Sequence, residues 1–142
     1  GLAAEISRQL HNALSNAGIE PSIGVIAPFR AQCALIQDFL DDDLKTKITV
    51  DTVERYQGSE RDVILFSATA NYDCMLERMS SISDLNGERV DRKLNVAITR
   101  AKEYLVIIGN SRVLSSGEVY SKMITLLREK SNFINIDTIY NT

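Results

Sequence analysis

Apolar residues recur along the chain in two spacings, one typical of helices and one typical of buried strands. A helix is predicted over residues 2–14, where leucine or isoleucine recurs every fourth position, and Gly18 and Pro21 end it. The short apolar run at residues 23–27 predicts a strand buried on both faces, which Pro28 stops.

The same alternation continues to the end of the chain. Further helices are predicted at residues 31–40, 94–102 and 119–128, and further strands at residues 48–53, 63–67, 104–109 and 133–140. Residues 71–90 are polar and mixed, with an Asn86-Gly87 turn, and are predicted as a long loop with room for one helical turn. Alternating strands and helices predict an α/β fold: a three-layer sandwich around a mostly parallel central sheet.

Composition agrees with one globular domain spanning residues 1–142. Hydrophobic residues make up 44% and charged residues 25% of the chain, which is typical of a domain that buries a core. The sequence contains no repeat, linker, signal peptide or apolar run near the roughly 18 residues of a membrane helix. With only two cysteines, far apart, a reduced cytoplasmic setting is expected.

Four minor features are expected to be structural. Cys33 is predicted to be a small buried hydrophobe, and Cys74 has no neighbouring base that would make it a nucleophile. His11, the only histidine, is expected to be solvated. The acidic run 41–43 is expected to be a loop at a helix end rather than a metal site, and no metal site is predicted.

The net charge of −3 argues against a general basic nucleic-acid binder, which relies on many Lys and Arg contacts to phosphates. Any nucleic-acid contact must therefore be local, through backbone amides, hydroxyls and a few cations. In a parallel sheet, ligands gather at the carboxyl ends of the strands. Three segments close to the ends of predicted strands are therefore candidates: residues 27–32, 52–62 and 94–102.

Arg100 is the most informative residue of the third segment. It lies in a mostly apolar helical run, and an arginine held on a packed helix is a preorganised cation of the kind that stabilises charge in phosphoryl transfer. A surface ion pair with a local acid such as Glu103 is the alternative, and ion pairs of that kind are common.

The other two segments also allow two interpretations each. Gly58 permits a positive φ or a close approach to a phosphate, and Glu60 can hold a sugar hydroxyl or orient an arginine; the alternative is a solvated charged loop. Pro28 ends a strand and Gln32 opens a helix whose first amides can meet a phosphate. The alternative there is an ordinary turn between a strand and a helix.

Taken together, the three segments resemble motifs of a known family. IGVIAPFRAQ (residues 23–32) is similar to motif IV, DTVERYQGSERDVILFS (51–67) to motif V and RKLNVAITRAKEYLVIIGN (92–110) to motif VI of superfamily 1 helicases. The resemblance is to the group of the nonsense-mediated-decay helicase and the replication nuclease-helicases, and it runs from about Ile23 to Asn110. It implies the second RecA-like motor domain of such a helicase, a P-loop NTPase type that lacks its own P-loop.

The resemblance also implies roles for single residues. Arg100 corresponds to the arginine finger that reaches the γ-phosphate of ATP from across the cleft between two motor domains. The nucleotide contacts that it implies are Gln57, Gly58, Glu60 and Lys102. The contacts to the nucleic-acid backbone that it implies are Pro28, Arg30 and Thr52.

Two positions depart from the family pattern. Position 27 is Ala where the family often has Thr, so a hydroxyl contact to a phosphate is in doubt there. Position 54 is Glu where Asp is frequent, and the longer side chain can change a local hydrogen bond.

The chain has no G-x-x-x-x-G-K-[ST] run and no acidic magnesium motif after an apolar strand. The resemblance places the P-loop and the magnesium motif on a first RecA-like domain of the same longer chain. ATP with Mg²⁺ is therefore the expected substrate of the two domains together, and the isolated chain is expected to have no ATPase activity. The resemblance also implies single-stranded DNA or RNA as the track, with 5′ to 3′ polarity, and the sequence does not distinguish DNA from RNA.

Two other functions are compatible with an α/β domain. A nucleic-acid clamp with a degenerate ATP site is one, although the intact QGSE and TRAK runs argue against decay. A doubly wound small-molecule enzyme is the other, and it would need a Gly-rich first turn where this chain has Pro28-Phe29-Arg30.

Overall fold

The computed structural model describes residues 2–56, 60–68, 82–85, 88–130 and 132. Its centre is a four-stranded sheet in the order β2-β1-β3-β6, in which every pairing is parallel. The strands are β1 (Ile23–Ala27), β2 (Ile48–Thr52), β3 (Arg61–Ala68) and β6 (Ala101–Gly109). A second, two-stranded antiparallel sheet pairs β4 (Ile82–Leu85) with β5 (Glu88–Asp91).

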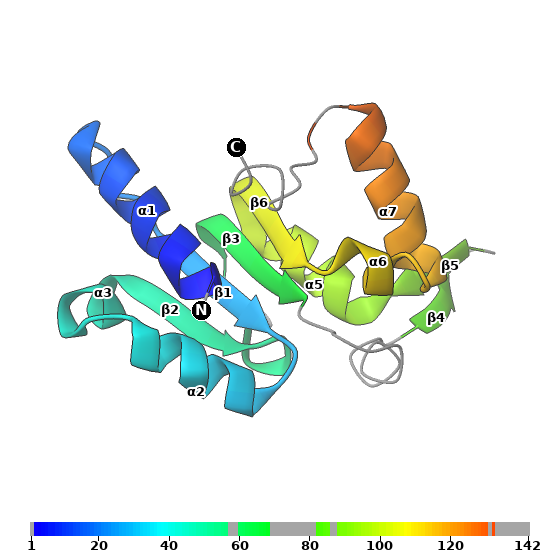
Figure 1. Cartoon of the computed structure of the whole chain (residues 1–142), viewed down its shortest axis with the longest axis horizontal. Coiled ribbons are helices and arrows are strands. Elements are labelled where there is room, and N and C mark those ends of the chain that lie inside the picture. Colours follow the sequence, from blue (N-terminus) through cyan, green and yellow to red (C-terminus); the bar gives the residue numbers. More distant parts are fainter. Residues whose placement is uncertain (1, 57–59, 69–81, 86–87, 131, 133–142) are drawn as a thin grey trace.

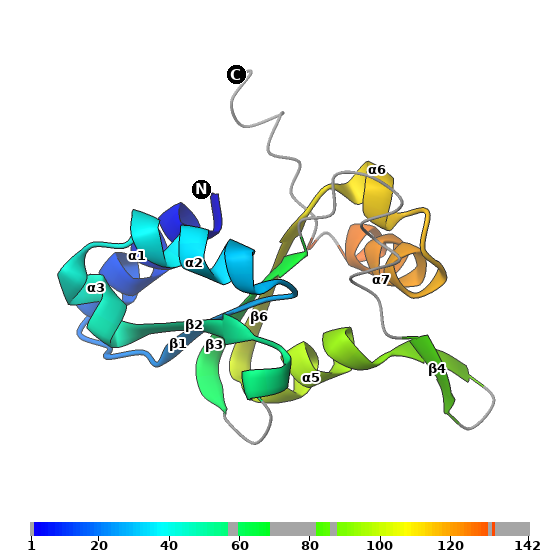
Figure 2. The ribbon, with the colours of Figure 1, turned by 90° about the horizontal axis from the view of Figure 1, so that it is seen from below.

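Helices cover both faces of the parallel sheet, as Figures 1 and 2 show. The first face packs against α1 (Leu2–Asn16), α2 (Arg30–Phe39) and α3 (Asp42–Lys47). The second packs against α5 (Arg92–Arg100), α6 (Ser111–Leu114) and α7 (Glu118–Glu129), with the 3-10 turn η1 (Glu54–Tyr56). The predicted α/β three-layer sandwich with a parallel sheet is confirmed.

Side chains alternate between these two cores along the central strands. In β1, Ile23 and Val25 face the first core and Ile26 faces the second. In β3, Leu65 joins the first core and Phe66 the second, and both are fully buried. Both faces of the sheet are therefore covered, which explains why these strands are continuously apolar in the sequence.

Helix α1 ends as its sequence predicts. Gly18 has φ of +81°, the Gly18 amide donates to the Ser15 carbonyl at 3.0 Å and the Ile19 amide donates to the Leu14 carbonyl at 2.9 Å. These two bonds are the Schellman arrangement, which favours glycine at the left-handed position.

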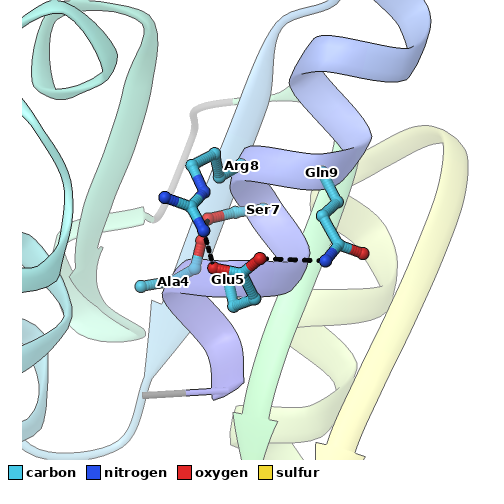
Figure 3. Close-up of polar contacts among 5 residues, drawn as sticks. All are labelled: Ala4, Glu5, Ser7, Arg8 and Gln9. Carbon is cyan, nitrogen blue, oxygen red and sulfur yellow. Dashed lines mark hydrogen bonds and ion pairs between the residues drawn. The ribbon is translucent and has the colours of Figure 1, made fainter.

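Helix α1 carries local polar contacts on both its exposed and its buried side (Figure 3). Glu5 accepts a hydrogen bond from Gln9 at 2.9 Å and pairs with Arg8, while the Ser7 hydroxyl donates to the Ala4 carbonyl at 2.8 Å. The expectation for His11 is wrong: its side chain is 5% exposed, and Nδ1 has no hydrogen-bond partner within the described part of the chain.

Several predicted boundaries also need correction. The helix predicted to reach residue 102 ends at Arg100, and the strand predicted from residue 104 begins at Ala101. The loop predicted over 71–90 is wrong where β4 and β5 form a hairpin; its other residues, and the strand predicted at 133–140, lie outside the described residues. The acidic run 41–43 opens α3, since the Asp41 side chain accepts a bond from the Leu44 amide at 2.9 Å.

Cys33 is buried, as predicted. Within the described ranges there is no cluster of three or more His, Cys, Asp or Glu side chains that would hold a metal ion. No helix in those ranges combines the length and apolar character that crossing a membrane requires.

Candidate functional site

The predicted site residues lie at two opposite edges of the parallel sheet. Parallel strands bring their carboxyl ends to one edge and their amino ends to the other. The predicted nucleic-acid contacts are at the carboxyl edge: Pro28, Arg30 and Thr52. The predicted nucleotide contacts that the structure describes are at the amino edge: Glu60, Arg100 and Lys102. Gln57 and Gly58 lie outside the described residues.

At the carboxyl edge, β1 and β2 end side by side. Ala27 pairs in register with Thr52, which is 7% exposed, and Pro28 follows as a buried residue. Arg30 is exposed and is the first residue of α2. Its cap residue, Phe29, offers no side-chain acceptor to the amides of the first turn. One exposed cation and a helix N-terminus therefore share this edge, and both favour an anion.

Gln32 anchors α2 at this edge. Its side-chain amide donates to the Ser67 hydroxyl at 3.0 Å and to the Ser67 carbonyl at 3.3 Å. Ser67 is 1% exposed near the carboxyl end of β3. The start of α2 is thus tied to the sheet rather than left as a free turn.

At the amino edge, Arg100 ends a helix that is fixed at several points. Asp91 caps α5, since its Oδ1 accepts bonds from the Lys93 amide at 3.0 Å and the Leu94 amide at 3.1 Å. Leu94 and Ala97 anchor the helix in the core. Arg100 is the last helical residue, where a positive charge also complements the helix dipole.

The surroundings of the Arg100 guanidinium bear on the alternative that this residue forms a surface ion pair. Arg100 is half-buried, and its Nε and Nη2 lie 3.4 and 3.3 Å from the Thr99 hydroxyl oxygen. It forms no ion pair with Glu103 or with any other acid among the described residues. The guanidinium is therefore held from one side only, with its charge not neutralised by a described carboxylate.

Lys102 is exposed on β6, next to the amino end of β3. Hydrogen bonds from the backbone and side chain of Ser22 lower the pKa of Asp62, and the charge of Lys102 lowers it further. Lys102 thus lies beside Asp62, one residue after Ala101, which pairs in register with Arg61. Cations at this edge suit an anionic ligand such as a phosphate chain.

The candidate segments were chosen by the rule that ligands gather at the carboxyl ends of strands. Only residues 27–32 and Thr52 lie at those ends. Segment 52–62 starts at the carboxyl edge and reaches the amino edge, and Arg100 precedes β6 instead of following a strand of this sheet. Glu54, one of the two departures from the family pattern, lies on this path. Its carboxylate is 3.9 Å from the Lys93 ammonium, so it joins η1 to α5.

Two residues on this path, Tyr56 and Arg61, were not predicted from the sequence as candidates. Tyr56 is 2% exposed in η1, and the Arg61 guanidinium carbon lies 5.7 Å from the centre of its ring. Burial raises the pKa of Tyr56 to about 12. The sequence does contain a pattern that could have identified these two residues: an aromatic residue directly before residues 57–60 and an arginine directly after them.

Comparison with known proteins identifies relatives over most of the chain. The family described as an AAA domain matches residues 2–112. The DNA replication ATP-dependent helicase/nuclease JHS1 of Arabidopsis thaliana is 31% identical over 134 residues, which are 94% of this chain and 10% of that protein. The DNA polymerase alpha-associated DNA helicase A of Saccharomyces cerevisiae is 36% identical over 124 residues, 86% of this chain and 17% of that protein.

The ATP-dependent helicase NAM7 of Saccharomyces cerevisiae is 36% identical over 120 residues, 80% of this chain and 12% of that protein. The chain thus spans between 10% and 17% of the length of these three relatives. Each of them carries the word helicase in its name, and the similarity extends across both edges of the sheet.

Proposed function

Since the chain belongs to this AAA-domain family, we propose that it is one half of an ATP-driven motor on single-stranded nucleic acid. The family forms the second RecA-like motor domain of superfamily 1 helicases in the group of the nonsense-mediated-decay helicase and the replication nuclease-helicases. ATP with Mg²⁺ binds between this domain and a first motor domain, which supplies the P-loop and the magnesium ligands. Closure of the two domains moves the motor 5′ to 3′ along the strand.

Arg100 is the proposed arginine finger, and its placement is the observation that carries the proposal. During hydrolysis, water attacks the γ-phosphorus and the bond from that phosphorus to the bridging oxygen of ADP breaks. Negative charge spreads over the γ-oxygens, where a guanidinium aimed from the facing domain stabilises it. A half-buried arginine at the end of a capped helix, with no acidic partner among the described residues, fits this task.

The remaining nucleotide contacts are proposed on the same side. Glu60 and Lys102 share the amino edge with Arg100, and the sequence places Gln57 and Gly58 directly before Glu60. Lys102 adds a second positive charge for the phosphate chain, while Gln57 and Glu60 contact the nucleotide through their polar groups.

The nucleic-acid contacts are proposed at the opposite edge. The first-turn amides of α2, the Arg30 guanidinium and the Thr52 hydroxyl contact the phosphate backbone of the strand near Pro28. The two edges are about 13 Å apart along β1, given roughly 3.3 Å per residue. ATP and nucleic acid can therefore bind at the same time without competing.

The test uses the polypeptide that carries this domain together with its first motor domain. We compare ATP hydrolysis of the wild type, Arg100→Ala and Arg100→Lys, with single-stranded DNA and RNA in separate assays. Arg100→Ala is expected to lower kcat by about 10³ to 10⁵ while nucleotide binding is largely kept, as for other arginine fingers. Lysine cannot reproduce the planar fork of donors and is expected to restore little.

Arg8→Ala is the matched control, because Arg8 lies on the outer side of α1 and pairs locally with Glu5 (Figure 3). It should leave the rate unchanged. Full activity of Arg100→Ala would show that the finger assignment is wrong. A parent polypeptide that binds nucleic acid but hydrolyses no ATP would instead favour the clamp with a degenerate ATP site.

A further inference from the structure

The carboxyl edge of the sheet continues past the proposed nucleic-acid contacts, as far as the end of β6. Pro28, Arg30 and Thr52 lie at the ends of β1 and β2, on one side of this edge, whereas β6 ends on the other side. We propose that Arg112, which follows β6, binds a phosphate of the same single strand. The inference rests on the proposed function and lengthens its nucleic-acid site across the whole edge.

The strand register brings the ends of β1, β3 and β6 to nearly the same level. Ile26 of β1 pairs with Phe66 of β3, and Ala68, two residues further along β3, pairs with Gly109, the last residue of β6. Only β3 separates β1 from β6, so the two strands end about 10 Å apart, given roughly 4.8 Å between neighbouring strands. A single strand that contacts the end of β1 can therefore also reach the end of β6.

Arg112 occupies the same position after β6 that Arg30 occupies after β1. Each is the third residue after the last residue of its strand. The helices that carry them, α6 and α2, pack on opposite faces of the sheet, and Figure 1 shows both starting beyond the arrowheads of their strands. The two arginines therefore flank one edge from its two faces.

The short helix α6 is fixed against the end of β6. The Asn110 side-chain oxygen accepts hydrogen bonds from the Arg112 amide at 3.1 Å and the Val113 amide at 3.3 Å. Val113 and Leu114 are buried. A Cβ added to Gly109 would be 2.6 Å from Leu114 Cδ1, so glycine is needed for α6 to pack this closely. The backbone of Arg112 is therefore held by its neighbours on both sides.

The Arg112 side chain, by contrast, is available to a ligand. It is exposed, and it forms no ion pair or hydrogen bond with any other residue in the described ranges. A guanidinium is always charged and offers five N–H donors, which suit phosphate oxygens. Because phosphates carry no sequence information, the contact is expected to serve DNA and RNA alike.

The experiment measures how affinity for a single strand depends on salt. The two-domain polypeptide is titrated into fluorescent oligothymidylate or oligouridylate, and fluorescence anisotropy gives Kd at a series of KCl concentrations. Each phosphate neutralised in a single strand contributes about −0.7 to the slope of log K against log salt. Arg112→Ala is therefore expected to make the slope less negative by about 0.7 for both strands. Binding at low salt should weaken by about fivefold, as for the loss of one exposed ion pair.

Two further variants test the charge and its placement. Arg112→Lys keeps a cation that binds phosphate and should retain most of the slope. Asn110→Ala removes the cap of α6 and should weaken binding more in the wild-type background than in Arg112→Ala, where no cation is left to position. An equal loss in both backgrounds would show that the cap does not act through Arg112.

Arg8→Ala is the matched control, because it also removes one positive charge, from an arginine of α1 that pairs with Glu5. Its slope should equal that of the wild type, and a change as large as that of Arg112→Ala would mean that only net charge matters. A purely structural role of Arg112 at the end of α6 would lower the melting temperature and leave the slope unchanged, which would overturn the proposal.

Arg30→Ala, measured in parallel, separates this inference from the proposed function. If Arg30→Ala changes the slope and Arg112→Ala does not, the extension of the site to β6 alone is wrong. If neither changes it, the nucleic-acid edge of the proposed function fails as well.

Discussion

At the scale of single residues, the amino ends of β1 and β3 are joined by a reciprocal pair of hydrogen bonds. The Ser22 amide donates to the Asp62 carboxylate at 3.0 Å, and the Asp62 amide donates to the Ser22 hydroxyl oxygen at 2.8 Å. The Val63 amide also donates to the Ser22 carbonyl at 3.1 Å. These bonds fix the edge of the sheet at which Glu60 and Arg100 lie.

The ionised Asp62 carboxylate is expected to make stability depend on pH. The bonds from Ser22, aided by Lys102, lower its pKa in the folded state. Because the pKa in the folded state lies below the unfolded value of about 4, the ionised carboxylate stabilises the fold at pH values above that unfolded pKa. This stabilisation is lost as the pH falls through the pKa of the folded state. Urea unfolding from pH 7 to pH 3 should show wild type more stable than Asp62→Asn at pH 7. The difference should shrink below about pH 4, and a difference that stays constant across this range would contradict the prediction.

His11 was wrongly expected to be solvated because the sequence predicted the helix α1 but not which of its sides is most buried. The leucine and isoleucine spacing identifies one face of the helix. In the structure Ala3, Ser7 and His11, each one position after a leucine or isoleucine, are buried, while Leu10 and Leu14 are partly buried and pack against the core. Small side chains let α1 approach the sheet, and His11 is buried because it shares their side of the helix.

At the scale of elements, α5 matters most because it carries Arg100. Its N-terminus depends on Asp91, which is completely buried and whose Oδ1 accepts two backbone amides. Its Oδ2 has no hydrogen-bond partner in the described ranges. The cap therefore needs one side-chain oxygen and does not depend on the second.

Substitutions at Asp91 test this arrangement. Asp91→Ala removes the acceptor and is expected to lower the free energy of unfolding by about 1 kcal/mol, typical of a lost N-cap. Asp91→Asn keeps one oxygen acceptor and is expected to cost much less. Urea denaturation gives both values, and Asn110→Ala, which removes a similar cap on the short helix α6, is the comparison. Equal losses for Asp91→Ala and Asp91→Asn would mean that the charge, not the cap, is what stabilises α5.

The elements that were predicted well from the sequence are those with a clear spacing of apolar residues. The apolar strands β1, β2 and β3 and the helices α1, α2 and α7 lie close to their predicted positions. The boundary between α5 and β6 was missed because residues 101–103 (Ala-Lys-Glu) are compatible with a helix in sequence, and they become strand by pairing with β3 from Arg61 onward. The short polar elements α3, β4 and β5 have no apolar period that a sequence pattern could reveal.

At the scale of the whole molecule, the two proposed sites lie at opposite edges of the four-stranded sheet. The motifs identified the candidate residues but not the edge of the sheet at which each one lies. A sequence motif such as residues 52–62, which runs from one edge to the other, does not show where along it the chain changes edge. Parallel pairing of β2, β1, β3 and β6 makes that assignment. The same topology explains why the residues on segment 52–62 divide between the two sites.

The 142-residue chain by itself is expected to have no ATPase activity. Arg100 can stabilise charge on a γ-phosphate only when another surface holds the nucleotide, and the chain contains no G-x-x-x-x-G-K-[ST] loop to cradle it. The purified chain is therefore expected to fold, as judged by circular dichroism and a cooperative melt, and to release no phosphate from ATP and Mg²⁺ with or without single-stranded nucleic acid. Arg100→Ala purified in parallel identifies contaminating ATPase, which would be equal in both samples. Phosphate release that is present in the wild type and absent in Arg100→Ala would show that this domain binds and hydrolyses ATP without a first motor domain.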